Sequence, residues 1–354
     1  MNGLRDETHT CWSMVAALVL TGSSCMLNGA GSGDDPNGLP HGFVRIGDTI
    51  LYHTVVLDNV DAGSFQVLDG SFCKDEQRVF YFDSYRESRD YFLTKKHLVE
   101  ELVGADASTF EVLGYDYAKD SAQAWYQAVA FRVADLRSLQ ALDVHFVKDD
   151  VQAYLDRKPI RGSHGRSFAL IDHSYARDST RYYYIQGSGD DRAITPIPCD
   201  VSSFSILDLT YAKDKVRVYH EGGKLSEALP GSFVVLGSSY AKDAQRVYFR
   251  DQRIAGADPA SFVLFSENEN SRGETYYAQD KERIYVNAEP FVGVEKGTFR
   301  IMDEKYTADR NGVYYRMKKM LGADPLTFRV YPHYLGDADA EDKAHKYGDG
   351  KVVE

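Results

Sequence analysis

The chain has 354 residues, with 41 Lys and Arg against 53 Asp and Glu, so its formal net charge is −12. This acidity argues against nucleic acid as a partner, because phosphate backbones are bound by basic surfaces. Aromatic residues make up 13% of the chain, led by 25 Tyr, which is too many for a disordered acidic protein.

The first 24 residues predict a signal peptide. Their apolar run, CWSMVAALVL, is too short for a transmembrane helix. The stretch LTGSSC resembles the lipobox of bacterial lipoproteins, in which the cysteine, here Cys25, becomes the lipidated first residue. It departs from that pattern at Gly22, where leucine is usual, and in the early acids Asp6 and Glu7. The Gly-rich residues 25–42 then predict a flexible tether. The alternative for the apolar run is a buried N-terminal strand or helix, and the tether that follows argues against it.

From residue 43 onward, one short pattern recurs to the end of the chain and predicts a repeat protein. In each copy an aspartate follows Tyr-Ala-Lys or a variant of it, and a phenylalanine follows Ser or Thr. The step is 29 residues where no insertion intervenes, as from Asp214 to Asp243. We therefore expect residues 43–354 to form one domain of about nine stacked units. The recurring aspartates, predicted to form turns, are Asp75, Asp120, Asp149, Asp178, Asp214, Asp243, Asp280, Asp309 and Asp342. The recurring phenylalanines, predicted to form the core, are Phe65, Phe110, Phe168, Phe204, Phe233, Phe262, Phe299 and Phe328.

Alternation within one unit predicts three short strands. Residues 233–235 alternate between two faces, which indicates a strand with one buried face. Residues 247–249 are bulky on both faces, which indicates a second strand covered on both sides. A short third strand is expected at residues 253–255, and the Asp-Pro pair at 258–259 closes the unit with a turn.

The repeat also predicts how the units assemble. A unit of 29 residues cannot bury its own apolar face, but stacked copies cover one another. The expected fold is therefore all-β, with the three-stranded units stacked into an elongated solenoid-like or twisted array. A closed β-propeller is the alternative, and we rank it second because three strands are fewer than the usual four of a propeller blade.

Three polar insertions interrupt the period, near residues 83–96, 186–193 and 266–274. Their composition predicts surface loops, where added length costs little. They also define the alternative function, an enzyme or toxin-related factor whose site is built from the insertions. That alternative requires the insertions to converge on one cleft with paired carboxylates, such as Glu267, Glu269 and Glu274.

The copies YAKDKVRVYH, YAKDAQRVYF, YARDSTRYYY and TADRNGVYYR resemble the DKNYY family of bacterial repeat proteins. The shared motif is an Asp-Lys-Asn-like turn followed by Val-Tyr-Tyr, and the resemblance runs from about residue 43 to the C-terminus. It implies an envelope or secreted bacterial protein. It brings no catalytic residues to this chain.

Motifs of catalysis, cofactor binding and metal binding are missing from the sequence. No His-Glu-x-x-His, Cys-x-x-Cys or Walker-type pattern occurs. Ser163 and His164 are adjacent, but they align with the unit-closing turn. Calcium takes six or more oxygen ligands, whereas each unit offers one constant aspartate, usually beside Lys or Arg. Cys73 stands where other units have Ala and is expected to be a small buried residue, without a disulfide to Cys199.

These observations favour a non-catalytic protein of the bacterial cell envelope that offers an extended binding or structural surface. We expect no cofactor, and a protein or glycan of the cell surface as the partner. The membrane contact is expected only through a lipid anchor at Cys25, in the outer membrane where one exists. A secreted or periplasmic location is the alternative, and we expect a monomer.

Overall fold

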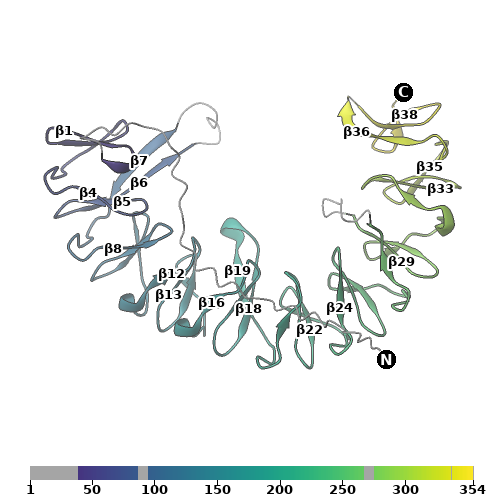
Figure 1. Ribbon diagram of the computed structural model, residues 1–354, viewed down its shortest axis with the longest axis horizontal. Coiled ribbons are helices and arrows are strands. Elements are labelled where there is room, and N and C mark those ends of the chain that lie inside the picture. Colours follow the sequence, from purple (N-terminus) through teal and green to yellow (C-terminus); the bar gives the residue numbers. More distant parts are fainter. Residues whose placement is uncertain (1–38, 87–94, 267–274, 336, 354) are drawn as a thin grey trace, which may run out of the picture.

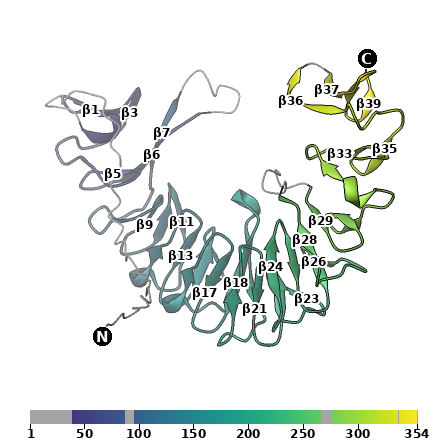
Figure 2. The same cartoon turned by 45° about the vertical axis from the view of Figure 1, so that its right-hand side comes forward.

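A computed structural model describes residues 39–86, 95–266, 275–335 and 337–353. Within these residues the chain forms ten small antiparallel sheets, numbered 1 to 10 here in chain order. Figure 1 shows them following one another along an open arc, and Figure 2 shows the two ends of the arc apart from a second angle. The only helices in the described part are single 3-10 turns. The prediction of an all-β tandem array is therefore confirmed.

Sheet 1 contains three strands, β1 (Phe43–Ile46), β2 (Thr49–Tyr52) and β3 (Val55–Leu57), and each of the other nine described sheets contains four. Their first strands are β4 (Gln66–Val67), β8 (Glu111–Gly114), β12 (Gln140–Ala141), β16 (Ala169–Leu170), β20 (Ser205–Ile206), β24 (Val234–Gly237), β28 (Val263–Leu264), β32 (Arg300–Ile301) and β36 (Arg329–Leu335). Their second strands are β5 (Phe72–Lys74), β9 (Tyr117–Lys119), β13 (Phe146–Lys148), β17 (Tyr175–Arg177), β21 (Tyr211–Lys213), β25 (Tyr240–Lys242), β29 (Tyr277–Gln279), β33 (Tyr306–Asp309) and β37 (Ala338–Glu341).

The third strands are β6 (Val79–Tyr85), β10 (Ala124–Tyr126), β14 (Ala153–Leu155), β18 (Tyr182–Gln186), β22 (Val218–His220), β26 (Val247–Phe249), β30 (Ile284–Val286), β34 (Gly312–Tyr315) and β38 (Lys346–Gly348). The fourth strands are β7 (Lys96–Glu101), β11 (Val129–Phe131), β15 (Lys158–Pro159), β19 (Ala193–Ile197), β23 (Gly223–Leu225), β27 (Gln252–Arg253), β31 (Glu289–Pro290), β35 (Lys318–Met320) and β39 (Lys351–Val352). The 3-10 turns are η1 (Pro40–Gly42), η2 (Leu136–Ser138), η3 (Gly165–Ser167), η4 (Gly189–Asp191) and η6 (Lys296–Thr298).

The prediction of three strands per unit was wrong. The missed strand is the Tyr-Ala-Lys stretch itself, as in β25, which pairs with the first strand on one side and the third on the other. Its Tyr and Ala are both fully buried, so its burial does not alternate and the period-two signal is lost. The strand count therefore gives no reason to rank a propeller second, because four strands are the usual number for a propeller blade.

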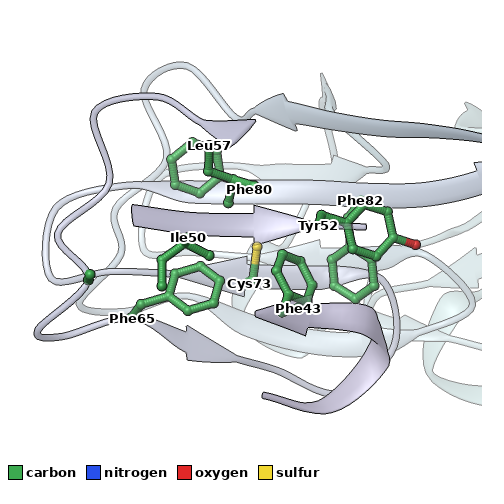
Figure 3. Close-up of a cluster of buried hydrophobic side chains, with 9 residues drawn as sticks. Phe43, Ile50, Tyr52, Leu57, Phe65, Cys73, Phe80 and Phe82 are labelled. Atoms are coloured by element: carbon green, nitrogen blue, oxygen red, sulfur yellow. The ribbon is translucent and has the colours of Figure 1, made fainter. Parts of the chain in front are cut away.

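The sheets stack face to face, and each core cluster is shared by two neighbours. Between sheets 6 and 7, for example, Tyr211 and Val218 of sheet 6 pack with Ala241 and Tyr248 of sheet 7, around Phe233. Figure 3 shows the corresponding cluster between sheets 1 and 2. The third strands are covered on both faces, as expected, because alternate side chains enter the clusters on either side.

Each sheet has two chemically different edges. The turn between the first and second strands is hydrogen-bonded to the turn between the third and fourth, as when the Arg250 N–H donates to the Ser239 carbonyl at 2.8 Å. We call this side the inner edge, because the extended hairpins β6–β7 and β18–β19 project from it into the arc (Figure 1). The opposite, outer edge holds the aspartate turns and the linkers between sheets.

Candidate functional site

The recurring aspartates are buried hydrogen-bond acceptors at the outer edge. Asp243 is 3% exposed, and its Oδ1 accepts from the N–H groups of Gln245 and Arg246 at 2.7 and 2.8 Å. Its Oδ2 accepts from the hydroxyl of Tyr248 and from the N–H of Leu229, both at 3.0 Å. One carboxylate therefore closes the turn, holds the tyrosine of the third strand and fixes the linker that enters the sheet.

The same arrangement recurs along the array. The tyrosine hydroxyl also donates to Asp149, Asp178, Asp214, Asp280, Asp309 and Asp342. In sheet 3 the indole N–H of Trp125 replaces the hydroxyl and donates to Asp120 at 3.0 Å, and in sheet 2 the position is Phe80, which has no donor. These oxygens are occupied by protein donors, and among the described residues no three His, Cys, Asp or Glu side chains gather as a metal site requires.

Hydrogen bonds lower the pKa of several of these aspartates, among them Asp149, Asp178 and Asp243. Burial alone would raise the pKa of Asp178, but the bonds from Tyr183, from the His164 N–H and from Thr180 outweigh it and lower the pKa to about 2. The tyrosines shift the other way: burial, followed by the bond to Asp149, raises the pKa of Tyr154 to about 12.

Two further positions of the repeat have roles that the sequence analysis missed. The hydroxyl before each phenylalanine accepts the N–H of the residue after the aspartate, as Ser232 does from Ala244 at 3.0 Å. In sheets 2, 3, 4, 6 and 7 the residue before the aspartate is lysine, and it reaches the linker to the next sheet, as when Lys242 Nζ donates to the Pro259 carbonyl at 2.8 Å. A Ser or Thr that recurs at a fixed spacing before the recurring Asp was a visible signal of such a side-chain network.

The structure buries most of the predicted core phenylalanines. Phe168, Phe233 and Phe262 are at most 2% exposed, and Phe65, Phe110 and Phe328 are also buried. Phe204 and Phe299 are only half-buried. The array is therefore not uniform, and the junctions that contain these two residues differ from the others.

Other predicted positions are also located by the structure. Cys73 is fully buried and free, and Cys199 is half-buried and free. Ser163 donates to the Ile160 carbonyl, and the N–H of His164 donates to Asp178, so both belong to a linker turn. Cys25 lies outside the described residues, as do residues 1–24 and most of the tether. No described helix is long and apolar enough to cross a membrane.

The first two insertions lengthen hairpins at the inner edge. The first extends β6–β7 of sheet 2, and the second extends β18–β19 of sheet 5, with sheets 3 and 4 between them. The third follows β28 of sheet 8, and its acids Glu267, Glu269 and Glu274 lie outside the described residues. The described parts of the insertions thus stand on separate sheets.

The junction between sheets 5 and 6 departs most clearly from the repeat. The third strand of sheet 5, β18, begins with Tyr182, whereas the third strand of sheet 6 begins with the fully buried Val218. Tyr182 is half-buried, and its ring lies 4.3 Å from that of Phe204, with 31° between the planes. Arg177 occupies the lysine position, but it is exposed, and its side chain bonds to no described residue.

A cavity of about 420 Å³ opens beside these residues. Its apolar wall is formed by Ala169, Leu170, Ile171 and Ile206, its aromatic side by Tyr182 and Phe204, and its charged group is Arg177. The pairing partner of Arg177 across the sheet is Ala169, whereas Lys119 at the same position of sheet 3 lies 3.6 Å from Glu111. The guanidinium is therefore available to a ligand in the cavity.

The same junction contains an unsatisfied hydroxyl. Tyr175 is fully buried, and its hydroxyl has no hydrogen-bond partner among the described residues. Its counterpart in sheet 6, Tyr211, donates to the carbonyls of Ser239 and Arg250 in sheet 7. Burial, followed by the neighbouring Tyr184, raises the pKa of Tyr175, so the group stays neutral.

Stacked four-stranded sheets, each tied by the same buried carboxylate, define the class of this molecule as a β-repeat protein. The chain belongs to the DKNYY family, whose model matches residues 40–129 and 211–351. The resemblance noted in the sequence is thereby confirmed. No curated protein and no solved structure is significantly similar to the chain.

The family match leaves residues 130–210 unmatched between its two segments. All seven residues that line the cavity fall in that stretch. The departures from the repeat and the break in the family match therefore coincide at one junction, which makes it the best candidate for a site particular to this chain.

Proposed function

We propose that the protein is a non-catalytic component of the bacterial cell envelope whose β-repeat array serves as an extended binding surface. The observation that carries the proposal is the use of the constant residues. Asp, Tyr, and Ser or Thr are engaged in closing turns and joining sheets, as is Lys in the units where it precedes the aspartate. Residues free to recognise a partner are therefore those that vary from unit to unit.

The array is proposed to be open and solenoid-like. Closure into a propeller would stack the last sheet on the back of the first. In sheet 10, Lys346 is exposed at the position where sheet 7 buries Val247. In sheet 1, Val44 and Val56 are 40% and 51% exposed on the face that other sheets bury against their predecessor. The polar face of sheet 10 does not match this apolar face. Small-angle X-ray scattering tests this, since a closed ring gives a shorter maximum dimension than the arc of Figure 1.

The inner edge is the proposed recognition surface, because the hairpins β6–β7 and β18–β19 lengthen it into the arc. A trimmed variant tests this role. Sheet 5 pairs Tyr184 with Thr195, as sheet 7 pairs Phe249 with Gln252. Residues 185–194 can therefore be replaced by the two-residue Arg-Asp turn of sheet 7.

Cross-linking in intact envelopes should capture a protein or glycan with the wild type and lose it with the trimmed variant. Equal capture by both would contradict the proposal.

Attachment to the envelope is proposed to run through Cys25, after removal of residues 1–24. The support is the order of apolar run, small residues, cysteine and Gly-rich tether. Several acyl chains on one cysteine should resist a high-salt wash, because their binding is hydrophobic. The Cys25→Ser variant should leave the membrane fraction. If this variant remains in the membrane fraction, or if the mass of the mature wild type still includes residues 1–24, the proposed lipid anchor at Cys25 is contradicted.

A further inference from the structure

We propose that the cavity between sheets 5 and 6 binds a small aromatic carboxylate. The inference rests on the proposed role of the array as a binding scaffold and adds a ligand class to it. A cavity of about 420 Å³ lies within the size range of small-molecule sites. Its opening departs from the repeat at both Arg177 and Tyr182, whereas the aspartate turn at this junction keeps its usual bonds, such as that from Tyr219 to Asp214 at 2.8 Å.

The walls select a flat apolar group. Ala169, Ile171 and Ile206 supply aliphatic surface, and the rings of Tyr182 and Phe204 supply aromatic surface for stacking. Apart from Arg177 and the Tyr182 hydroxyl, these side chains carry no polar groups. A sugar, which needs several hydrogen-bond partners, would leave its hydroxyls unpaired there.

The charge of the ligand is set by Arg177. It is the charged residue of the lining, and no described acid or carbonyl neutralises it. A planar guanidinium binds a carboxylate through two parallel hydrogen bonds, which a lysine cannot do. The lysines at this position in sheets 6 and 7, Lys213 and Lys242, are instead turned to backbone carbonyls of the next linker. An aromatic ring bearing a carboxylate matches both halves of the cavity.

The test compares two probes of the same shape, 2-naphthoate and the neutral 2-naphthalenemethanol, by isothermal titration and ligand-observed NMR on the intact protein. The wild type should bind naphthoate saturably and about tenfold more tightly than the alcohol. Arg177→Gln should abolish this preference. Tyr182→Val, which introduces the residue that sheet 6 has at this position (Val218), should weaken the binding of both probes. Because this valine is native to the repeat, the variant is expected to fold, and circular dichroism verifies it.

Arg161→Gln is the matched control, since Arg161 is an exposed arginine of a neighbouring linker that does not line the cavity. It should leave both affinities unchanged. The inference is overturned if the wild type fails to saturate, if it binds both probes equally, or if the Arg177→Gln and Tyr182→Val variants bind like the wild type. Hairpin trimming and membrane fractionation test the envelope role independently, so a failure here can be told from a failure there.

Discussion

Two neighbouring junctions share the sequence pattern of the repeat but differ in their packing. One lies between sheets 6 and 7, and the other lies between sheets 5 and 6. In the first, Val218 is fully buried and Phe233 is 2% exposed, so the sheets meet over a closed core. In the second, Tyr182 and Phe204 occupy these positions, both are half-buried, and a cavity opens beside them. The two junctions therefore show how a repeat acquires a site without losing its stacking.

The hydrogen bonds of the recurring aspartate are the same at both junctions. Asp214 accepts from Tyr219 and from the Asp200 N–H, both at 2.8 Å, just as Asp243 accepts from its own tyrosine and linker. The changes beside the cavity fall on Arg177 and Tyr182, which do not bond to the aspartate, although Arg177 lacks the linker bond that Lys213 makes. Position-specific recognition can thus vary while the outer edge keeps each sheet in place.

The largest expected difference concerns the core phenylalanines. Phe233→Ala should lower the free energy of unfolding by roughly 3–5 kcal/mol, because a buried ring is removed and a cavity remains. Phe204→Ala should cost about half as much or less, because its ring is already partly solvated beside an existing cavity. Urea unfolding of both variants under the same conditions measures the difference. Equal costs would mean that the junction between sheets 5 and 6 is as tightly packed as its neighbour.

Removing the buried aspartate should lower the free energy of unfolding by the same amount at both junctions. Asp243→Ala and Asp214→Ala each leave buried donors unpaired and should lower the free energy of unfolding by about 2–4 kcal/mol. This exceeds the cost of a simple turn residue, because each carboxylate serves four donors. A much smaller loss for the Asp214 variant would show that other contacts hold the linker at the junction with the cavity.

Acid should weaken the aspartate turns in which folding lowers the pKa, such as those of Asp178 and Asp243. Because folding lowers the pKa of Asp178 to about 2, the ionised form is favoured in the folded state. Its contribution to stability is complete above the unfolded pKa of about 4 and is lost as the pH falls through about 2. The urea midpoint should therefore drop between these two pH values. Asp178→Asn should be less stable at neutral pH and should show a shallower drop, and an equally steep drop in this variant would assign the acid transition to other groups.

The repeat itself could be predicted from the sequence, because its signals are local. Alternation after Phe233 and the bulky triplet Val247–Phe249 gave two strands, and the recurring Asp gave the turns. The Tyr240–Lys242 strand was missed, because burial of both its Tyr and its Ala removes the alternation on which a strand assignment depends. The hydrogen bond from the Leu229 N–H to Asp243 could not be predicted from the sequence either, because only the stacked fold brings these two residues together.

The candidate site illustrates the same limit. Arg177 in a lysine position and Tyr182 in a valine position were both visible in an alignment of the units. Both stand in the copy YARDSTRYYY, where the motif as a whole is kept. Their consequence depends on packing across the junction, where Phe204 comes from a linker more than twenty residues away. A sequence period identifies the unit, but it does not show where two altered units leave a space.

The smallest expected effect is also the sharpest contrast between the two junctions. Tyr211→Phe removes a hydroxyl that donates to the Ser239 and Arg250 carbonyls at 3.1 and 2.8 Å, and it should cost about 1 kcal/mol. Tyr175→Phe removes a buried hydroxyl that has no described partner, so it should be neutral or stabilising by up to about 1 kcal/mol. Both variants keep the ring and its packing, so the difference in their free energies of unfolding isolates the hydroxyl. A Tyr175→Phe cost equal to that of Tyr211→Phe would show that this hydroxyl is hydrogen-bonded in solution, and the two junctions would then differ only at their cavity side chains.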